Sequence, residues 1–122
     1  MLIRYAGVVL TLSGALALIL GLLFWTGAAL NLASMHMLLG FLAVGSLWVI
    51  GIGQFLSRSG SSVIAIGALF VGALTAVLGL YQASLLIGES HWIIKVTHLL
   101  LGVLMIGLGH MGAARHRKSL AG

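Results

Sequence analysis

Four long apolar segments, separated by short polar stretches, follow one another along the chain. They span Tyr5–Thr26, Ala33–Leu56, Ser62–Leu86 and Trp92–Ala113. A helix needs about 20 apolar residues to cross the hydrocarbon core of a bilayer, and each segment reaches about that length. Because lipid offers the backbone no hydrogen-bond partners, each segment must be helical. The pattern predicts an all-α, integral membrane four-helix bundle, and the short connections predict an up-down order with antiparallel neighbours.

The second half of the chain repeats the first. Gly14–Leu22 reads GALALILGL and Gly72–Leu80 reads GALTAVLGL, with six identities in nine positions. MHMLLGFLAVG around His36 likewise aligns with THLLLGVLMIG around His98. Such self-similarity indicates two copies of one structural unit. We therefore predict one transmembrane domain over the 122 residues, built from two repeated helical hairpins. The predicted hairpins are residues 5–56 and 62–113.

The composition excludes a soluble domain. Hydrophobic residues make up 61% of the chain and charged residues 6%, whereas soluble domains carry about 25% charged residues. The first apolar segment has the position of a signal peptide, with Gly27-Ala28-Ala29 as small residues for cleavage. Its length and its repetition as the third segment favour a retained helix.

Basic residues gather on one side of the predicted topology. They are Arg4, Arg58, Arg115, Arg117 and Lys118, whereas Lys95 and Glu89 fall on the other side. An excess of Lys and Arg marks the cytoplasmic side of a membrane. We predict a multi-pass protein of the cytoplasmic (inner) membrane with both termini in the cytoplasm. The net charge of +5 then faces anionic lipid headgroups of the bilayer, and we expect no nucleic-acid partner.

Two histidines occupy equivalent positions of the repeat inside the predicted spans. His36 and His98 are each followed four residues later by a glycine, Gly40 and Gly102. Ionisable residues inside a membrane are costly and usually functional. The helices that carry them run in the same direction, so both lie near the outer leaflet, where a two-fold axis would set them face to face. Two imidazoles opposed in an apolar slot predict axial ligation of one haem iron, with His36 and His98 as metal ligands.

Neighbouring residues fit the same interpretation. A glycine at the fourth position after each histidine lies on the same helix face and leaves room for a flat macrocycle. Lys95 shares a helix face with His98 and is placed for a haem propionate, and His91 either does the same or is solvated. Tyr81 and Gln82 lie level with the histidines and serve packing or line a quinone or haem edge. The chain has no cysteine, which excludes thiolate ligands and iron–sulfur sites.

On these residues the chain resembles the membrane-embedded b-type cytochromes built on four-helix bundles, such as the cytochrome b561-like and bacterial superoxide-oxidase families. The resemblance rests on Met35–Gly40, MHMLLG, and Thr97–Gly102, THLLLG. It implies haem b and one-electron transfer, with a quinone or a periplasmic redox partner, or within a larger redox complex. Two histidine pairs hold two haems in the cytochrome b561-like proteins. Only one pair is found here, so we expect one haem per chain.

Other interpretations stay open. The histidines can hydrogen-bond between helices of a cofactor-free accessory subunit or homo-oligomer. A small transporter or channel is a further alternative, although the first helix lacks the carboxylate expected of small multidrug-type transporters. His110 stands where the repeat has Trp48, so a second haem there would need another ligand, such as Met105 or Met111, or a neighbouring subunit. Acid–base hydrolysis lacks the residues that it needs.

Overall fold

The computed structural model describes residues 1–121, in which every regular element is a helix and no strand occurs. The elements are α1 (Leu2–Trp25), η1 (Leu30–Leu32), α2 (Ala33–Leu56), α3 (Ser62–Tyr81), η2 (Gln82–Ser84) and α4 (His91–Ala121). The prediction of an all-α chain with four long helices is therefore confirmed. All four are long and apolar enough to cross a membrane, which indicates a multi-pass membrane protein.

The ends of the helices follow local backbone chemistry. After α1, the Gly27 N–H donates to the Phe24 carbonyl and the Ala28 N–H to the Leu23 carbonyl. This pattern needs a left-handed residue, and Gly27 supplies it with φ +80°. At the start of α3, the Ser61 side chain accepts a hydrogen bond from the Ile64 N–H at 3.4 Å, as expected of an N-cap.

The largest differences from the boundaries predicted by hydropathy are at the ends of the third and fourth helices. The third helix ends at Tyr81 instead of Leu86, because the chain turns through η2 and Leu86 itself adopts φ +45°. The fourth helix continues past Ala113 to Ala121. The added segment is rich in alanine, arginine, lysine and leucine, which favour helix even where their charge ends the apolar span.

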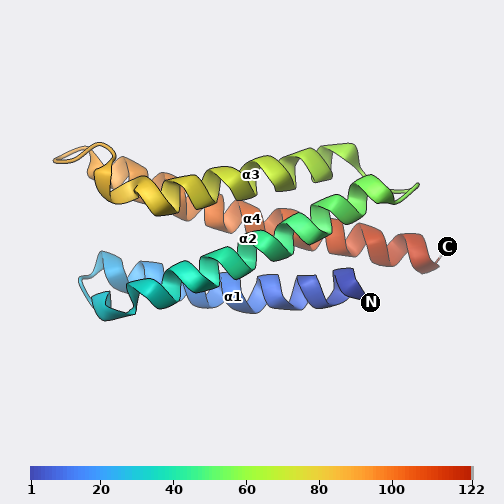
Figure 1. The fold of residues 1–122 in the computed structure, drawn as a ribbon, viewed down its shortest axis with the longest axis horizontal. Coiled ribbons are helices and arrows are strands. Elements are labelled where there is room, and N and C mark those ends of the chain that lie inside the picture. Colours follow the sequence, from blue (N-terminus) through green and yellow to red (C-terminus); the bar gives the residue numbers. More distant parts are fainter. Residues whose placement is uncertain (122) are drawn as a thin grey trace.

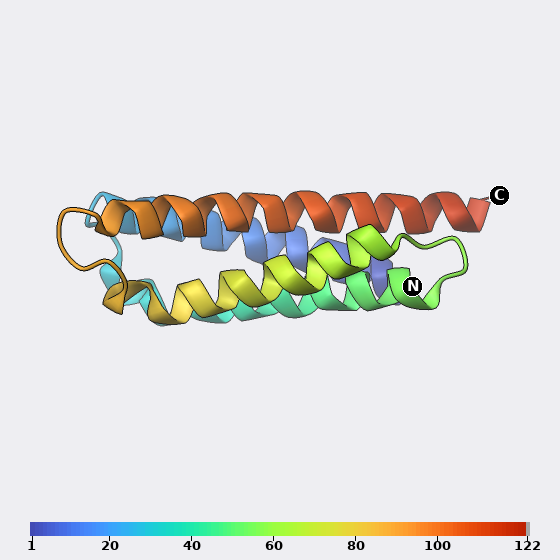
Figure 2. The same ribbon diagram turned by 90° about the horizontal axis from the view of Figure 1, so that it is seen from above.

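The four helices stand around a common axis in chain order. Figure 1 shows both termini and the α2–α3 connection at one end of the bundle, with the other two connections at the opposite end. Figure 2 shows α4 running the whole length of the bundle. Each helix contacts the next, α1 also contacts α4, and the diagonal pair α2 and α4 is in contact as well. The helices that carry the two predicted ligands therefore form an inner diagonal.

The half of the bundle nearer the termini is closely packed. Leu10, Leu47 and Ile50 are its largest fully buried side chains. Small residues bring the helices together there: a Cβ on Gly7 would lie 3.6 Å from the Cβ of Ala113, and one on Gly51 would lie 3.4 Å from the Ala65 carbonyl oxygen. Membrane helices commonly pack in this way, because small residues let their backbones approach.

The sides of the bundle are apolar. Large exposed side chains include Leu16, Phe41, Ile66, Phe70 and Leu104. A water-soluble protein rarely exposes so much continuous apolar surface, whereas lipid solvates it without cost. The exposed surface thus agrees with the length and hydropathy of the helices.

A buried amide ties three segments together at the end of α2. Gln54 is 2% exposed. Its Nε2 donates to the Gly112 carbonyl of α4 at 3.0 Å, and its Oε1 accepts from the Ser61 N–H before α3 at 3.2 Å. One side chain therefore fixes the α2–α3 connection against α4.

Replacing Gln54 with alanine should lower the free energy of unfolding by about 1–3 kcal/mol, because the Gly112 carbonyl loses a buried hydrogen bond and the Ser61 N–H a partly buried one. Unfolding in mixed micelles, followed by circular dichroism, measures the change. Thr97→Ala is the control, since Thr97 is exposed and bonds only to the Ile93 carbonyl of its own helix at 2.7 Å. That change should stay within about 0.5 kcal/mol. Equal losses in both variants would contradict the assigned role of Gln54.

Candidate functional site

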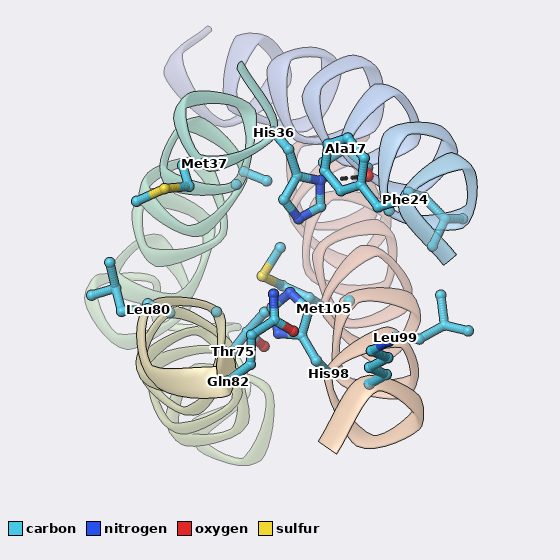
Figure 3. A pocket seen from close by; sticks show the side chains of 18 of the residues that line it. Ala17, Phe24, His36, Met37, Thr75, Leu80, Gln82, His98, Leu99 and Met105 are labelled. Carbon is cyan, nitrogen blue, oxygen red and sulfur yellow. Dashed lines mark hydrogen bonds between the residues drawn. The ribbon is translucent and has the colours of Figure 1, made fainter. Parts of the chain in front are cut away.

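A cavity of about 300 Å³ lies between the four helices, in the half of the bundle away from the termini. All four long helices and η2 contribute to its wall, as Figure 3 shows for many of the lining side chains. The polar or ionisable residues in the wall are His36, Thr75, Gln82, His91, Lys95 and His98. The remaining lining residues are glycines and apolar side chains. The volume falls at the lower end of the range of small-molecule sites, which is about 300–1,000 Å³.

His36 of α2 and His98 of α4 project into this cavity toward each other (Figure 3). Their ring centroids are 6.2 Å apart and their ring planes are inclined at 62°. They come from the diagonal pair of helices, one from each half of the chain. The structure thus brings together the two residues that the repeat singles out.

The His36 ring is held on two sides. Its Nδ1 lies 2.8 Å from the Ala17 carbonyl oxygen of α1, and Phe24 packs edge-on against it with centroids 5.3 Å apart. A carbonyl can only accept, so Nδ1 carries the proton of this hydrogen bond. In the neutral imidazole, Nε2 then keeps its lone pair, which is the state that a metal ligand requires.

The His98 ring packs against the bundle as the His36 ring does, but it lacks a hydrogen bond like the one from His36 to the Ala17 carbonyl. Glycines lie behind both rings: a Cβ on Gly21 would be 3.4 Å from Cε1 of His36, and one on Gly79 would be 3.1 Å from Cε1 of His98. These glycines are equivalent in the repeat. The Nδ1 atom of His98, however, is buried without a hydrogen-bond partner.

Gly40 and Gly102 both line the cavity, and a Cβ built on either would have no atom within 4 Å. The helix face beside each histidine is therefore bare. Lys95 is exposed and lines the cavity. His91 also lines it, with Nδ1 donating to the Leu85 carbonyl at 3.0 Å.

Other residues considered from sequence fall in different places. Gln82 lines the cavity, whereas Tyr81 is exposed and does not. Met105 is 3% exposed and lines the cavity of the two predicted ligands. It therefore belongs to the first candidate site instead of a second one. Met111 is an exposed residue of α4.

His110 takes part in a helix–helix contact. Its Nε2 lies 2.9 Å from Oγ1 of Thr11. The Thr11 hydroxyl donates to the Gly7 carbonyl at 2.8 Å, so it accepts from His110. At the equivalent place in the other half, Trp48 donates to the Leu69 carbonyl at 3.3 Å. Both contacts join a helix of one hairpin to a helix of the other.

Sequence reasoning missed three contributors to the site. Ala17 provides a backbone carbonyl, Phe24 a ring contact, and Thr75 a buried polar side chain in the cavity wall. The repeat alignment matches Ala17 with Thr75 and Phe24 with Gln82, so it marks these positions as ones where the two halves differ in polarity. It does not mark the backbone carbonyl of Ala17 as a hydrogen-bond acceptor.

No protein-family model, curated protein or solved structure matches the chain. Within residues 1–121, no group of three or more His, Cys, Asp or Glu side chains is placed to hold a metal ion. The candidate site is therefore interpreted from its own geometry, in which the rings of His36 and His98 face each other across the cavity.

Proposed function

We propose that this chain is a membrane haem protein in which His36 and His98 are the axial ligands of one b-type haem, and that it transfers single electrons. The observation that carries this proposal is the pair of opposed imidazoles, 6.2 Å apart between centroids, in an otherwise mostly apolar cavity.

The separation of the rings suits a shared metal ion. With metal–nitrogen bonds of about 2.1 Å, and about 1.1 Å from nitrogen to ring centre, two imidazoles on opposite sides of one ion have centroids about 6.4 Å apart. The observed distance agrees with this value to within a few tenths of an ångström. The hydrogen bond from His36 Nδ1 to the Ala17 carbonyl is also the usual support of a metal-bound histidine.

The set of donors favours a macrocycle over a bare ion. Two histidines alone leave a metal ion short of ligands, and a porphyrin supplies four nitrogens of its own. The bare faces beside the histidines, at Gly40 and Gly102, leave space for a flat ring system. Lys95 at the cavity wall is available to a propionate.

The residues of the chain have separate tasks in this proposal. Bound haem supplies a one-electron iron couple. His36 and His98 would hold the iron from both sides, which would favour electron transfer over turnover of a substrate at the metal. The mostly apolar wall would limit the access of water to the group.

The distribution of charge supports an orientation in the membrane. Arg4, Arg58 and the basic end of α4 lie at the end of the bundle that holds the termini, whereas the cavity occupies the other half. We propose two hairpins in up-down order across the inner membrane, with cytoplasmic termini and the haem near the outer leaflet. A quinone or a periplasmic redox protein would then reach the cavity side, within a monomer, an oligomer or a larger complex.

An absorption spectrum of the detergent-purified protein tests this proposal. After expression with ample haem, we expect a sharp Soret band and, on reduction with dithionite, the α-band of six-coordinate haem b. A colourless, monodisperse and helical preparation would contradict the proposal and favour a cofactor-free accessory subunit.

One haem per chain leads to a prediction for His110. Replacing His110 with alanine should leave the haem content and the reduced spectrum unchanged, because its Nε2 is engaged with Thr11. The lost hydrogen bond should cost only about 0.6 kcal/mol, the average for such contacts between membrane helices. A fall in haem content to half that of the unmodified protein would instead show a second haem at His110.

A further inference from the structure

The two walls of the cavity differ although the repeat relates them. Aligning the repeat pairs Ala17 with Thr75, Phe24 with Gln82, Ala29 with His91, and Ala33 with Lys95. The second residue of each pair lines the cavity and is polar. Every equivalent position on the first hairpin is alanine or phenylalanine. The His98 side of the cavity is therefore the polar side.

The two histidines also differ in the contacts that hold their rings in place. His36 has a carbonyl partner at 2.8 Å and an aromatic ring against it. His98 has a buried Nδ1 without a partner. Loss of such an outer partner typically weakens metal binding by about 10–100-fold. His98 should therefore be the weaker of two chemically identical ligands.

The surroundings of the two rings also favour release of His98 over release of His36. A released His98 imidazole remains beside Thr75 and Gln82, which offer it hydrogen-bonding groups. A released His36 imidazole would lose its carbonyl partner and meet alanine and phenylalanine instead. Burial of an unpaired polar group is costly, so release is easier on the His98 side.

We infer that His98 is a displaceable axial ligand and that the polar side of the cavity admits a small neutral diatomic molecule to the metal in its place. This inference rests on the proposed haem. The exchange is a substitution: the bond between iron and Nε2 of His98 breaks, a bond between iron and the diatomic molecule forms, and no electron is transferred. The site then binds a gas as well as carrying electrons.

Carbon monoxide added to the reduced, haem-loaded full-length protein tests the inference. We expect the Soret band to change to that of a carbon monoxide complex. The C–O stretching frequency in the infrared should match that of the complex of His98→Ala, in which His36 is the remaining ligand. A six-coordinate spectrum that carbon monoxide leaves unchanged would overturn the inference while leaving the proposed haem intact. Absence of any Soret band would overturn both.

A reciprocal pair of variants adds a kinetic test. Gln82→Phe gives His98 the aromatic neighbour that His36 has, and should slow carbon monoxide binding about tenfold by holding His98 on the metal. Phe24→Gln is the matched change on the other side and should leave the C–O stretch at the value expected for His36 ligation. Two results would identify His36 as the ligand that leaves. One is faster carbon monoxide binding in Gln82→Phe. The other is a C–O stretch of the unmodified protein that matches the stretch of the His36→Ala complex.

Discussion

Replacing either His36 or His98 with alanine will remove the six-coordinate haem spectrum, and replacing both will leave the purified protein without haem. Each imidazole would fill one axial position in the proposed site, and within residues 1–121 no group of three or more His, Cys, Asp or Glu side chains is placed to hold a metal ion. Haem content and the oxidised and reduced absorption spectra measure the effect. Circular dichroism checks that the variants remain helical.

The two single replacements should differ in degree. His36 is held by the Ala17 carbonyl and by Phe24, so His98→Ala should retain more haem than His36→Ala, by about tenfold in affinity. His110→Ala serves as a control for the loss of any membrane histidine. A six-coordinate spectrum that persists in either single variant would remove that histidine from the ligand set.

Filling the cavity at Gly40 or Gly102 with leucine will weaken haem binding in a bundle that still folds. Both glycines line the cavity, and each has open space where a side chain would extend. Haem bound between the two histidines would occupy that space, and forcing extra methylenes into a filled site costs about 1–3 kcal/mol. Haem affinity should therefore fall about tenfold to a hundredfold.

Gly45 and Gly107 provide matched controls on the same two helices. They also have open space around an added Cβ, but they are exposed and do not line the cavity. Gly45→Leu and Gly107→Leu should keep normal haem content, because their side chains extend toward lipid. Equal loss of haem in both sets of variants would show that leucine disturbs the helices and not the site.

Much of the fold could be predicted from the chain because a bilayer imposes simple rules. The second helix, Ala33–Leu56, has the bounds that hydropathy predicts. The ends of the third and fourth helices do not. Hydropathy locates the apolar span, whereas the helix ends where the backbone turns, at Tyr81, or continues through charged residues, as it does to Ala121.

The pair of histidines was also predictable, because two aligned segments repeat the same spacing from histidine to glycine. The contact between His36 and the Ala17 carbonyl was not. Every residue has a carbonyl, so no residue type marks the one that accepts this bond. The packing of Gly21 and Gly79 against the two rings was likewise hidden, because a glycine stripe predicts close helices without saying what approaches them.

The repeat also explains why two similar halves can differ in chemistry. Positions that the repeat pairs make equivalent contacts between helices, as Gly7 does with Ala113 and Gly51 with Ala65. Substitutions such as Ala17 against Thr75 then change one wall of the cavity without changing the helices that form it. A symmetric fold thereby gives its two candidate ligands different surroundings.

The most direct measurement is a titration of the haem-free protein with haemin in detergent, comparing the unmodified chain with the variant that lacks both His36 and His98. The proposed site predicts saturation at one haem per chain with a six-coordinate spectrum, and no such spectrum in the double variant. Saturation with the same spectrum in both proteins, or no specific binding to the unmodified chain, would contradict haem ligation by these two histidines.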